Sequence, residues 1–256
     1  DLTNLLEEVC APHLVVDPSR PTTVKTRVIS GGQHVVRVDE ESTEDVTSAV
    51  GQDVLNTFKA LLEGASRPDV VILEDYDKGV LTEETVSGLL AACKHAGLPV
   101  AVDPKLKRFQ SYHGVALFKP NLKELNEGLG LTEPVHPQQT SNMAKAVERL
   151  RSNLGCERVM VTLGEHGVWI HAPQEDIVHL HIPAVPREVM DVSGAGDTVI
   201  SVAALLLAAR CSAEAIARVS NLAGGWVCER VGVVPITKSD LQAELPRVHA
   251  SISDPR

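Results

Sequence analysis

The stretch DVSGAGDTVISVAALLLAA (residues 191–209) decides the fold class. A glycine-rich turn leads directly into an apolar run that predicts a buried helix from residue 195. The first N–H groups of a helix have no partner inside it, and the positive end of its dipole lies there. Gly194, Ala195 and Gly196 would therefore form an anion hole for a transferring phosphoryl group. Asp197 follows in the first turn, positioned to accept a proton from an attacking hydroxyl.

Upstream and downstream of this helix, strand-like and helix-like segments alternate. Apolar runs bounded by turn residues predict strands at 69–75, 98–104, 114–120, 158–164, 167–172 and 176–183. Helical patterns follow at 82–96, 122–128, 138–153, 195–209 and 213–230. This alternation predicts an α/β fold with a mainly parallel sheet flanked by helices. Ligands bind beyond the carboxyl ends of such strands, so residues just after 75, 103, 120 and 164 should face one site.

The segment PTTVKTRVISGGQHVVRVDEE (21–41) has a different pattern. Val24, Thr26 and Val28 alternate with Lys25 and Arg27, which predicts a strand with one polar face. A turn at 31–32 and a second strand at 34–39 complete a β-hairpin. The polar face indicates that this hairpin does not belong to a sheet covered on both sides.

Composition narrows the class of protein. The 256 residues are 43% hydrophobic, which excludes disorder and permits a large core. The net charge of −10 argues against broad nucleic-acid binding. The five cysteines contain no CxxC pair, which supports neither a disulfide scaffold nor a zinc ribbon. We expect a cytoplasmic protein with reduced thiols that binds neither nucleic acid nor a membrane.

Two common nucleotide motifs are absent from the sequence. It holds no G-x-x-x-x-G-K-[ST] phosphate loop and no G-x-G-x-x-G dinucleotide fingerprint. Ser193 has no His and Asp at a recognisable spacing, so a nucleophilic hydrolase is not supported. If the chain binds a nucleotide, the segment 191–198 is the candidate phosphate-binding motif.

That string resembles the signature of ribokinase-like (PfkB-type) carbohydrate kinases. The segment KPNLKEL (119–125) is similar to the N-x-x-E motif of that family, with Asn121 and Glu124. The resemblance implies that Glu124 helps to hold Mg²⁺ and the phosphates, a contact that is usually made through water in that family. It also implies a ribokinase-like three-layer fold, ATP as phosphoryl donor and room for a monovalent cation.

Two further segments match the nucleotide pocket of this family. TLGEHG (162–167) resembles its Thr-x-Gly-x-x-Gly turn, with Thr162, Gly164 and Gly167. SNLAGGWVCERVG (220–232) is similar to the helix beside adenine, which implies contacts from Asn221 and Gly225.

Within the family, the chain looks most like the heptose 7-phosphate kinase branch. The resembling strings are EDYDKGVLT (74–82), AVDPKLKRF (101–109), KPNLKEL and the hairpin. This resemblance implies conversion of heptose 7-phosphate to heptose 1,7-bisphosphate for lipopolysaccharide precursor synthesis. A phosphorylated acceptor is an anion and needs cations, for which the candidates are Lys25, Arg27, Lys78 and Lys105. Asp75 or Asp77 would hydrogen-bond sugar hydroxyls.

The resemblance covers residues 1–256 as one kinase domain, with residues 20–40 as a β lid that also mediates homodimerisation. Members of the family usually begin with a strand and a Gly-Gly-rich sugar-binding segment, and neither precedes Asp1. We therefore expect an N-terminally shortened domain. No H-x-G-H motif of a fused nucleotidyltransferase occurs.

Two alternatives remain open at this stage. In the first alternative, the acceptor is an unphosphorylated sugar or a nucleoside, and loss of the lid cations should hardly affect activity. Otherwise the chain is a degenerate nucleotide-binding or scaffold protein without turnover. The intact Asp197 and Glu124 argue against that reading, and the missing front segment argues for it.

Overall fold

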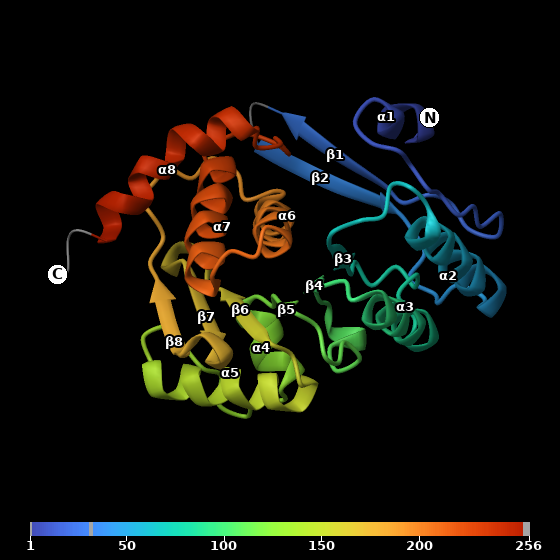
Figure 1. The fold of residues 1–256 in the computed structure, drawn as a ribbon. Coiled ribbons are helices and arrows are strands. Elements are labelled where there is room, and N and C mark those ends of the chain that lie inside the picture. The colour runs from blue at the N-terminus through green and yellow to red at the C-terminus, as the bar shows by residue number, and fades with distance from the viewer. Residues whose placement is uncertain (1, 31–32, 253–256) are drawn as a thin grey trace. The chain divides into compact units, whose positions relative to one another are not determined.

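The computed structural model describes residues 2–30 and 33–252 (Figure 1). It divides the chain into two compact units. Unit 1 contains residues 1–67 and 77–92, and unit 2 contains residues 68–76 and 93–256.

Unit 1 contains the hairpin and a helical part. Helix α1 (Leu2–Glu7) precedes strands β1 (Val24–Ser30) and β2 (Gln33–Glu40), which pair antiparallel with Val28 opposite Val36. The predicted hairpin is confirmed, and its predicted turn at 31–32 lies outside the described residues. The two strands form a sheet of their own, as the polar face indicated.

Two helices pack closely in unit 1. Helix α2 (Ser48–Glu63) was not predicted, whereas α3 (Glu83–Ala96) agrees with the helix predicted at 82–96. A Cβ atom added to Gly88 would lie 2.7 Å from the Leu55 side chain, and one added to Gly51 would lie 3.0 Å from Thr85 Oγ1. The absence of side chains at these two glycines permits the close approach of the helices.

Unit 2 is built on a six-stranded sheet in the order β3-β4-β5-β6-β7-β8. The strands are Val71–Glu74, Val100–Asp103, Leu117–Phe118, Arg158–Thr162, Val168–Ala172 and Ile177–Ile182. The pairings from β3 to β6 are parallel, and those of β6 with β7 and β7 with β8 are antiparallel. The predicted α/β class and mainly parallel sheet are confirmed, with an antiparallel extension at one edge.

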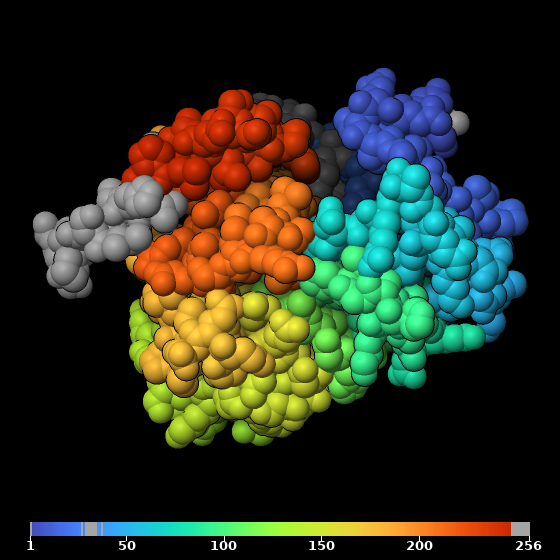
Figure 2. Space-filling model, viewed as in Figure 1, coloured from blue at the N-terminus to red at the C-terminus, as the bar shows by residue number. Residues whose placement is uncertain are grey.

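Helices cover both faces of this sheet. Figure 1 shows α6 (Ala195–Ala208) and α7 (Ala213–Cys228) on one face, and α4 (Leu122–Gly128) and α5 (Thr140–Leu154) on the other. Figure 2 shows α8 (Lys238–Ile252), which was not predicted, against the surface of α7. Within the described residues, no helix combines the length and apolar character that a membrane crossing requires.

Buried aliphatic side chains hold α6 and α7 on the sheet. Their core includes Leu117, Met160 and Ile170 from the strands and Ile200 and Ile216 from the helices, all fully buried. Burial of one such side chain contributes about 1.5–3 kcal/mol. Helix α6 packs on β3 and β4. Its first turn therefore lies near the carboxyl ends of those strands, which positions the candidate site.

Candidate active site

The turn before α6 has the geometry of an anion-binding helix start. Gly194 adopts a left-handed conformation (φ 78°), which favours glycine. The Thr198 N–H donates the first helical hydrogen bond to the Gly194 carbonyl at 2.9 Å. The Gly196 N–H comes before this first bond in the chain, so it belongs to the N–H groups that have no acceptor inside the helix. Such groups are the donors that bind an anion. The Ala195 N–H donates to the Val192 carbonyl at 3.3 Å and thus already takes part in the turn.

Asp191 fixes this turn to the segment after α7. Its carboxylate accepts hydrogen bonds from the Ser193 N–H at 2.9 Å and the Gly232 N–H at 3.0 Å. The Met190 N–H donates to the Cys228 carbonyl at 2.8 Å. Two hydrogen bonds therefore tie the loop that carries the glycines to the end of α7 and the segment after it.

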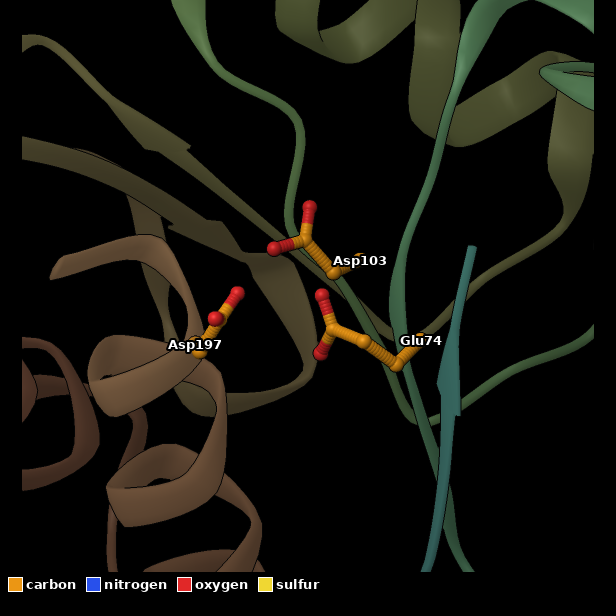
Figure 3. Close-up of side chains that lie close together, drawn as sticks. All are labelled: Glu74, Asp103 and Asp197. Atoms are coloured by element: carbon orange, nitrogen blue, oxygen red, sulfur yellow. The ribbon is translucent and has the colours of Figure 1, made fainter. Parts of the chain in front are cut away.

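Three carboxylates converge in front of this turn (Figure 3). Asp197 comes from α6, Glu74 from the end of β3 and Asp103 from the end of β4. One oxygen atom of each carboxylate lies within 4.8 Å of the other two. Residues at the carboxyl ends of two parallel strands thus meet the start of a helix, the arrangement expected for a ligand site in such a sheet.

A buried lysine neutralises part of this charge. Lys119 Nζ lies 2.8 Å from Asp103 Oδ2, and both side chains are buried. A Cβ atom added to Gly196 would lie 3.7 Å from the same Asp103 oxygen and 3.9 Å from Lys119 Nζ. The glycine-rich turn therefore faces the Lys119–Asp103 pair directly.

The protonation of neighbouring groups follows from this crowding. Burial raises the pKa of Glu74 to about 8, with further contributions from the negative charges of Asp103 and Asp197 and opposition from Lys119. Burial, and then the charge of Asp197, also raises the pKa of Tyr76. At neutral pH Glu74 therefore carries a proton, which reduces repulsion among the three carboxylates.

The N-x-x-E motif is located at the start of α4. Asn121 Oδ1 accepts a hydrogen bond from the Glu124 N–H at 2.8 Å, and Glu124 Oε2 accepts one from the Asn121 N–H at 2.8 Å. These reciprocal bonds form a capping box. Glu124 Oε1 accepts a third bond from Lys105 Nζ at 2.9 Å. Both residues thus have a structural role in addition to their predicted contacts with ligands.

The Thr-x-Gly-x-x-Gly turn joins β6 to β7. Gly164 (φ 60°) and Gly167 (φ 86°) both have positive φ angles, which favour glycine. A Cβ atom on Gly167 would lie 2.1 Å from the Ile182 carbonyl oxygen, so no side chain fits there. Thr162 pairs with Asn121 through an isolated bridge and donates its N–H to the Pro120 carbonyl at 3.0 Å. The two predicted nucleotide motifs are therefore direct neighbours.

The two predicted residues of α7 contact the loop before α6. Asn221 Nδ2 donates to the Pro183 carbonyl at 2.9 Å. A Cβ atom on Gly225 would lie 2.9 Å from Nε of Arg187. Arg187 is buried and pairs with Glu229 at 2.7 Å and with a carboxylate of α8. In this structure both residues position the loop, and their contact with adenine stays a prediction.

The candidate cations are divided between the units. Lys105 belongs to unit 2, where it pairs with Glu124 and lies 3.9 Å from Asp103 Oδ1. These carboxylates raise the pKa of Lys105 despite the opposing effect of its burial. Lys25, Arg27 and Lys78 belong to unit 1. The side chain of Arg27 lies outside the described residues.

Sequence reasoning missed several members of the site. Lys119, Glu74 and Tyr76 were quoted only inside longer strings, with no role assigned. Glu74 and Lys119 lie at the last position but one of predicted strands, and Tyr76 directly follows a predicted strand. This position at a strand end was the signal that could have found them. Asp75, predicted as a sugar contact, is buried and accepts a hydrogen bond from the Tyr112 hydroxyl at 2.7 Å.

The residues present fit a divalent cation. Mg²⁺ takes oxygen ligands in octahedral geometry and retains several waters. The carboxylates of Glu74, Asp103 and Asp197 offer one oxygen each within 4.8 Å of one another. Both Glu124 oxygens accept hydrogen bonds from the protein, so a contact of Glu124 with the ion suits an intervening water.

Comparison with known proteins identifies relatives over most of the chain. The model of the pfkB family carbohydrate kinases matches residues 7–239. The bifunctional protein HldE of Azorhizobium caulinodans is 39% identical over 244 residues, covering 95% of this chain and 49% of that protein. HldE of Caulobacter vibrioides is 41% identical over 231 residues, covering 90% and 46%. The chain spans about half the length of these curated relatives.

Solved structures with a similar fold are also kinases. Phosphofructokinase-2 from Escherichia coli in complex with potassium has a TM-score of 0.69 and 19% identity, covering 84% of this chain and 67% of that chain. Ribokinase from Arabidopsis thaliana complexed with ribose and ATP has a TM-score of 0.60 and 21% identity, covering 83% and 65%. These matches confirm the predicted ribokinase-like fold.

Proposed function

Because the chain belongs to the pfkB family of carbohydrate kinases, we propose that it transfers the γ-phosphoryl group of ATP to a hydroxyl of a phosphorylated sugar. The predicted family and the predicted class of enzyme, an ATP-dependent carbohydrate kinase, are confirmed by this membership. The acceptor and the roles of individual residues are the proposed parts.

The observation that carries the proposal is the position of Asp197. It lies in the first turn of α6, beside the N–H groups of the helix start and next to the Lys119–Asp103 pair. Asp197 accepts the proton of the attacking hydroxyl. The Gly196 N–H and Lys119 stabilise the negative charge on the transferring phosphoryl group. Mg²⁺, when bound, neutralises charge on the phosphate oxygens.

Other residues of the site orient these groups. Tyr76 lies close to Asp197, whose charge contributes to the raised pKa of the tyrosine hydroxyl. Asp191 holds the glycine-rich turn against the segment after α7. The proposed nucleotide contacts are Asn121, Glu124, Thr162, Gly164, Gly167, Asn221 and Gly225, and the proposed anion hole is Gly194, Ala195 and Gly196. A monovalent cation is a further proposed ligand.

The proposed acceptor is heptose 7-phosphate, with heptose 1,7-bisphosphate as product. Support comes from the branch-specific strings at 74–82 and 101–109 and from the relatives named HldE. Support also comes from the charged side chains of Lys25 and Lys78, which meet at one carboxylate in unit 1. We place the reaction in the cytoplasm, where ATP is abundant.

The hairpin is proposed as a lid and as a dimer surface. Val24, Val28, Val36 and Val38 lie on one face of it, and each is between 45% and 57% exposed. Apolar side chains in such a row favour a partner surface. Sedimentation of the full-length protein tests this idea: we expect a dimer that deletion of residues 20–40 converts to a monomer. A monomer before the deletion would contradict the dimer but leave the lid role open.

The function itself is tested by an ADP-release screen with the full-length protein. The screen compares sugar phosphates with the corresponding free sugars and with nucleosides, and it includes Asp197→Asn as the inactive control. We expect the largest kcat/KM for a heptose phosphate. Faster turnover of a free sugar or nucleoside would shift the acceptor to the unphosphorylated class. No turnover of any acceptor would support a binding protein.

A further inference from the structure

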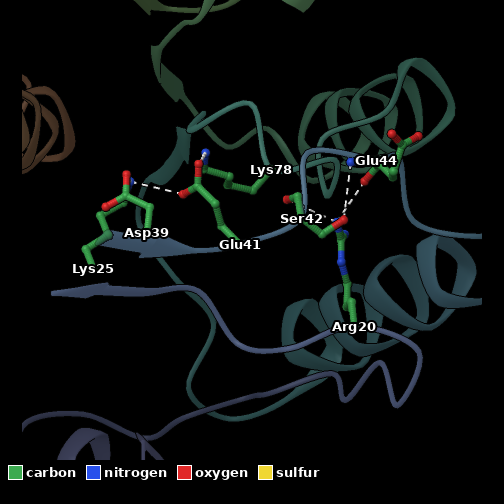
Figure 4. A network of polar contacts seen from close by, with 7 residues as sticks. All are labelled: Arg20, Lys25, Asp39, Glu41, Ser42, Glu44 and Lys78. Atoms are coloured by element: carbon green, nitrogen blue, oxygen red, sulfur yellow. Dashed lines mark hydrogen bonds and ion pairs between the residues drawn. The ribbon is translucent and has the colours of Figure 1, made fainter. Parts of the chain in front are cut away.

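Glu41 connects the two lysines in unit 1 that we assign to the acceptor phosphate (Figure 4). Its Oε2 atom lies 3.1 Å from Lys25 Nζ, and its Oε1 atom lies 2.5 Å from Lys78 Nζ. Each carboxylate oxygen thus accepts a bond from a different lysine. The two lysines come from segments far apart in the chain, and Glu41 is the group at which they meet.

The backbone around Glu41 is held in place. Arg20 Nη2 donates to the Glu44 carbonyl at 2.8 Å and to the Ser42 carbonyl at 3.3 Å (Figure 4). The Val46 N–H donates to the Gly79 carbonyl at 3.0 Å. A Cβ atom on Gly79 would lie 1.8 Å from the Glu44 carbonyl oxygen. The segment that carries Glu41 and the turn that carries Lys78 are therefore packed so closely that no side chain fits at position 79.

Among the described side chains, lysines and carboxylates are in direct contact at this point. Lys25 also lies 3.5 Å from Asp39, so two ammonium groups face two carboxylates. Lys78, and then Lys25, lower the pKa of Glu41, which is therefore ionised at neutral pH. The side chains of Lys25, Glu41 and Lys78 remain 34%, 20% and 24% exposed. An anion from solution can therefore reach the lysines and exchange with the carboxylate.

A carboxylate bound by two ammonium groups occupies the place that a phosphate group would take. Both anions accept charge-assisted hydrogen bonds from lysine, and a dianionic phosphate forms the stronger ones. With Glu41 in place, an incoming phosphate meets a pair of lysines that is already neutralised. Binding then requires the phosphate to displace Glu41, and the cost of that displacement reduces its apparent affinity.

We propose that Glu41 is an internal competitor for the anionic group of the acceptor, holding Lys25 and Lys78 together until a phosphate group takes its place. This inference rests on the proposed phosphorylated acceptor. It assigns to Glu41 a role in specificity, because only an acceptor with sufficient negative charge replaces the carboxylate. A neutral sugar gains nothing from the exchange and leaves the lysines paired with Glu41.

The test compares Glu41→Gln with Glu44→Gln, which removes the same charge three residues away. Glu44 contacts Arg20 through its backbone carbonyl, which the substitution leaves unchanged. We expect Glu41→Gln to lower the KM for the sugar phosphate about five- to tenfold, less than a buried charge-assisted contact would give because the group is partly exposed. The KM for ATP and the KM for a free sugar should stay within about twofold. Glu44→Gln should leave all three values unchanged.

Inorganic phosphate separates this inference from the proposed function. Calorimetric titration with phosphate should show tighter binding to Glu41→Gln than to the wild-type full-length protein, and Lys78→Ala added to Glu41→Gln should remove the gain. This holds even if no sugar phosphate is turned over, a result that would reject only the proposed acceptor. Unchanged or weaker phosphate binding by Glu41→Gln, in a variant with wild-type melting temperature, would overturn the inference. An increased KM for the sugar phosphate would do the same.

Discussion

Lys119 and Lys78 each pair with a carboxylate, but their surroundings differ. Lys119 and Asp103 in unit 2 have 3% and 6% of their side-chain surface exposed, whereas Lys78 and Glu41 in unit 1 have 24% and 20%. A buried pair that loses one partner leaves an uncompensated charge in a low-dielectric interior. A partly exposed pair can exchange its partner with water or with a dissolved anion. The first pair therefore fixes the geometry of a site, and the second is suited to ligand exchange.

The largest effect is expected at Asp197, which lies beside the buried pair without being part of it. Asp197→Asn keeps the shape of the side chain and the helix start but provides a poor proton acceptor. We expect kcat to fall about 10²–10⁴-fold. The ATP dissociation constant and the melting temperature should stay close to wild type, because Lys119 and Asp103 remain paired. Turnover within about threefold of wild type would reject Asp197 as the base.

The comparison itself is tested by removing each lysine. Lys119→Met removes the nearer cation of the buried Asp103 and, among the described residues, leaves only Lys105, 3.9 Å from its Oδ1 atom. We expect a loss of about 3 kcal/mol in the free energy of unfolding, measured with urea. Lys78→Met should cost only about 0–1 kcal/mol, as is usual for an exposed pair. The double substitution Asp103→Asn with Lys119→Met serves as a control and should recover part of the loss. If Lys119→Met and Lys78→Met lower the free energy of unfolding by the same amount, burial does not distinguish the two ion pairs.

Smaller effects are expected from the cations assigned to the acceptor. Lys25→Ala and Lys78→Ala should each raise the KM for the sugar phosphate about tenfold and leave the KM for ATP unchanged. Because these side chains are partly exposed, the difference from wild type should shrink with added salt. Arg27→Ala and Lys105→Ala test the remaining two candidates in the same assay. Unchanged acceptor kinetics in all four variants would remove the phosphorylated acceptor but not the kinase.

Local signals predicted much of the fold. Helix α4 was predicted at 122–128 and is observed over Leu122–Gly128, because its capping residues Asn121 and Glu124 are readable in the sequence. The hairpin followed from alternation of polar and apolar residues. Helix α2 was not predicted, although its N-cap residue Thr47 is a readable signal in the sequence. Helix α8 contains Pro246, which weakens a helical pattern.

The candidate site was only partly predictable, for a physical reason. Gly194 and Asp197 belong to one continuous string, so their proximity follows from local geometry. The pairing of Lys119 with Asp103 depends on β4 and β5 being neighbours in the sheet, which is a tertiary fact. The meeting of Lys25 and Lys78 at Glu41 likewise depends on contacts between distant segments. A sequence indicates which residues carry charge, but not which opposite charge each one meets.

The smallest effect concerns Glu74, whose carboxyl group lies beside the buried pair and carries a proton at neutral pH. Its pKa is raised from 4.5 to about 8, first by burial and then by Asp103 and Asp197. Between these two pH values the unfolded chain releases the proton and the folded chain retains it. Stability therefore falls as pH rises from about 4.5 to 8, and it is independent of this group outside that window.

Glu74→Gln removes this titration while preserving size and hydrogen-bonding capacity. In chelator-treated protein without nucleotide, its melting temperature relative to wild type should increase by a few degrees, roughly 2–6 °C, between pH 5 and pH 8. The gain is modest because the group is partly exposed to solvent. In an Asp197→Asn background the same comparison should give a smaller increase, since one of the charges that raises the pKa of Glu74 is gone. A difference between Glu74→Gln and wild type that is constant from pH 5 to pH 9 would show that Glu74 titrates normally, and that Lys119 neutralises the three carboxylates without a bound proton.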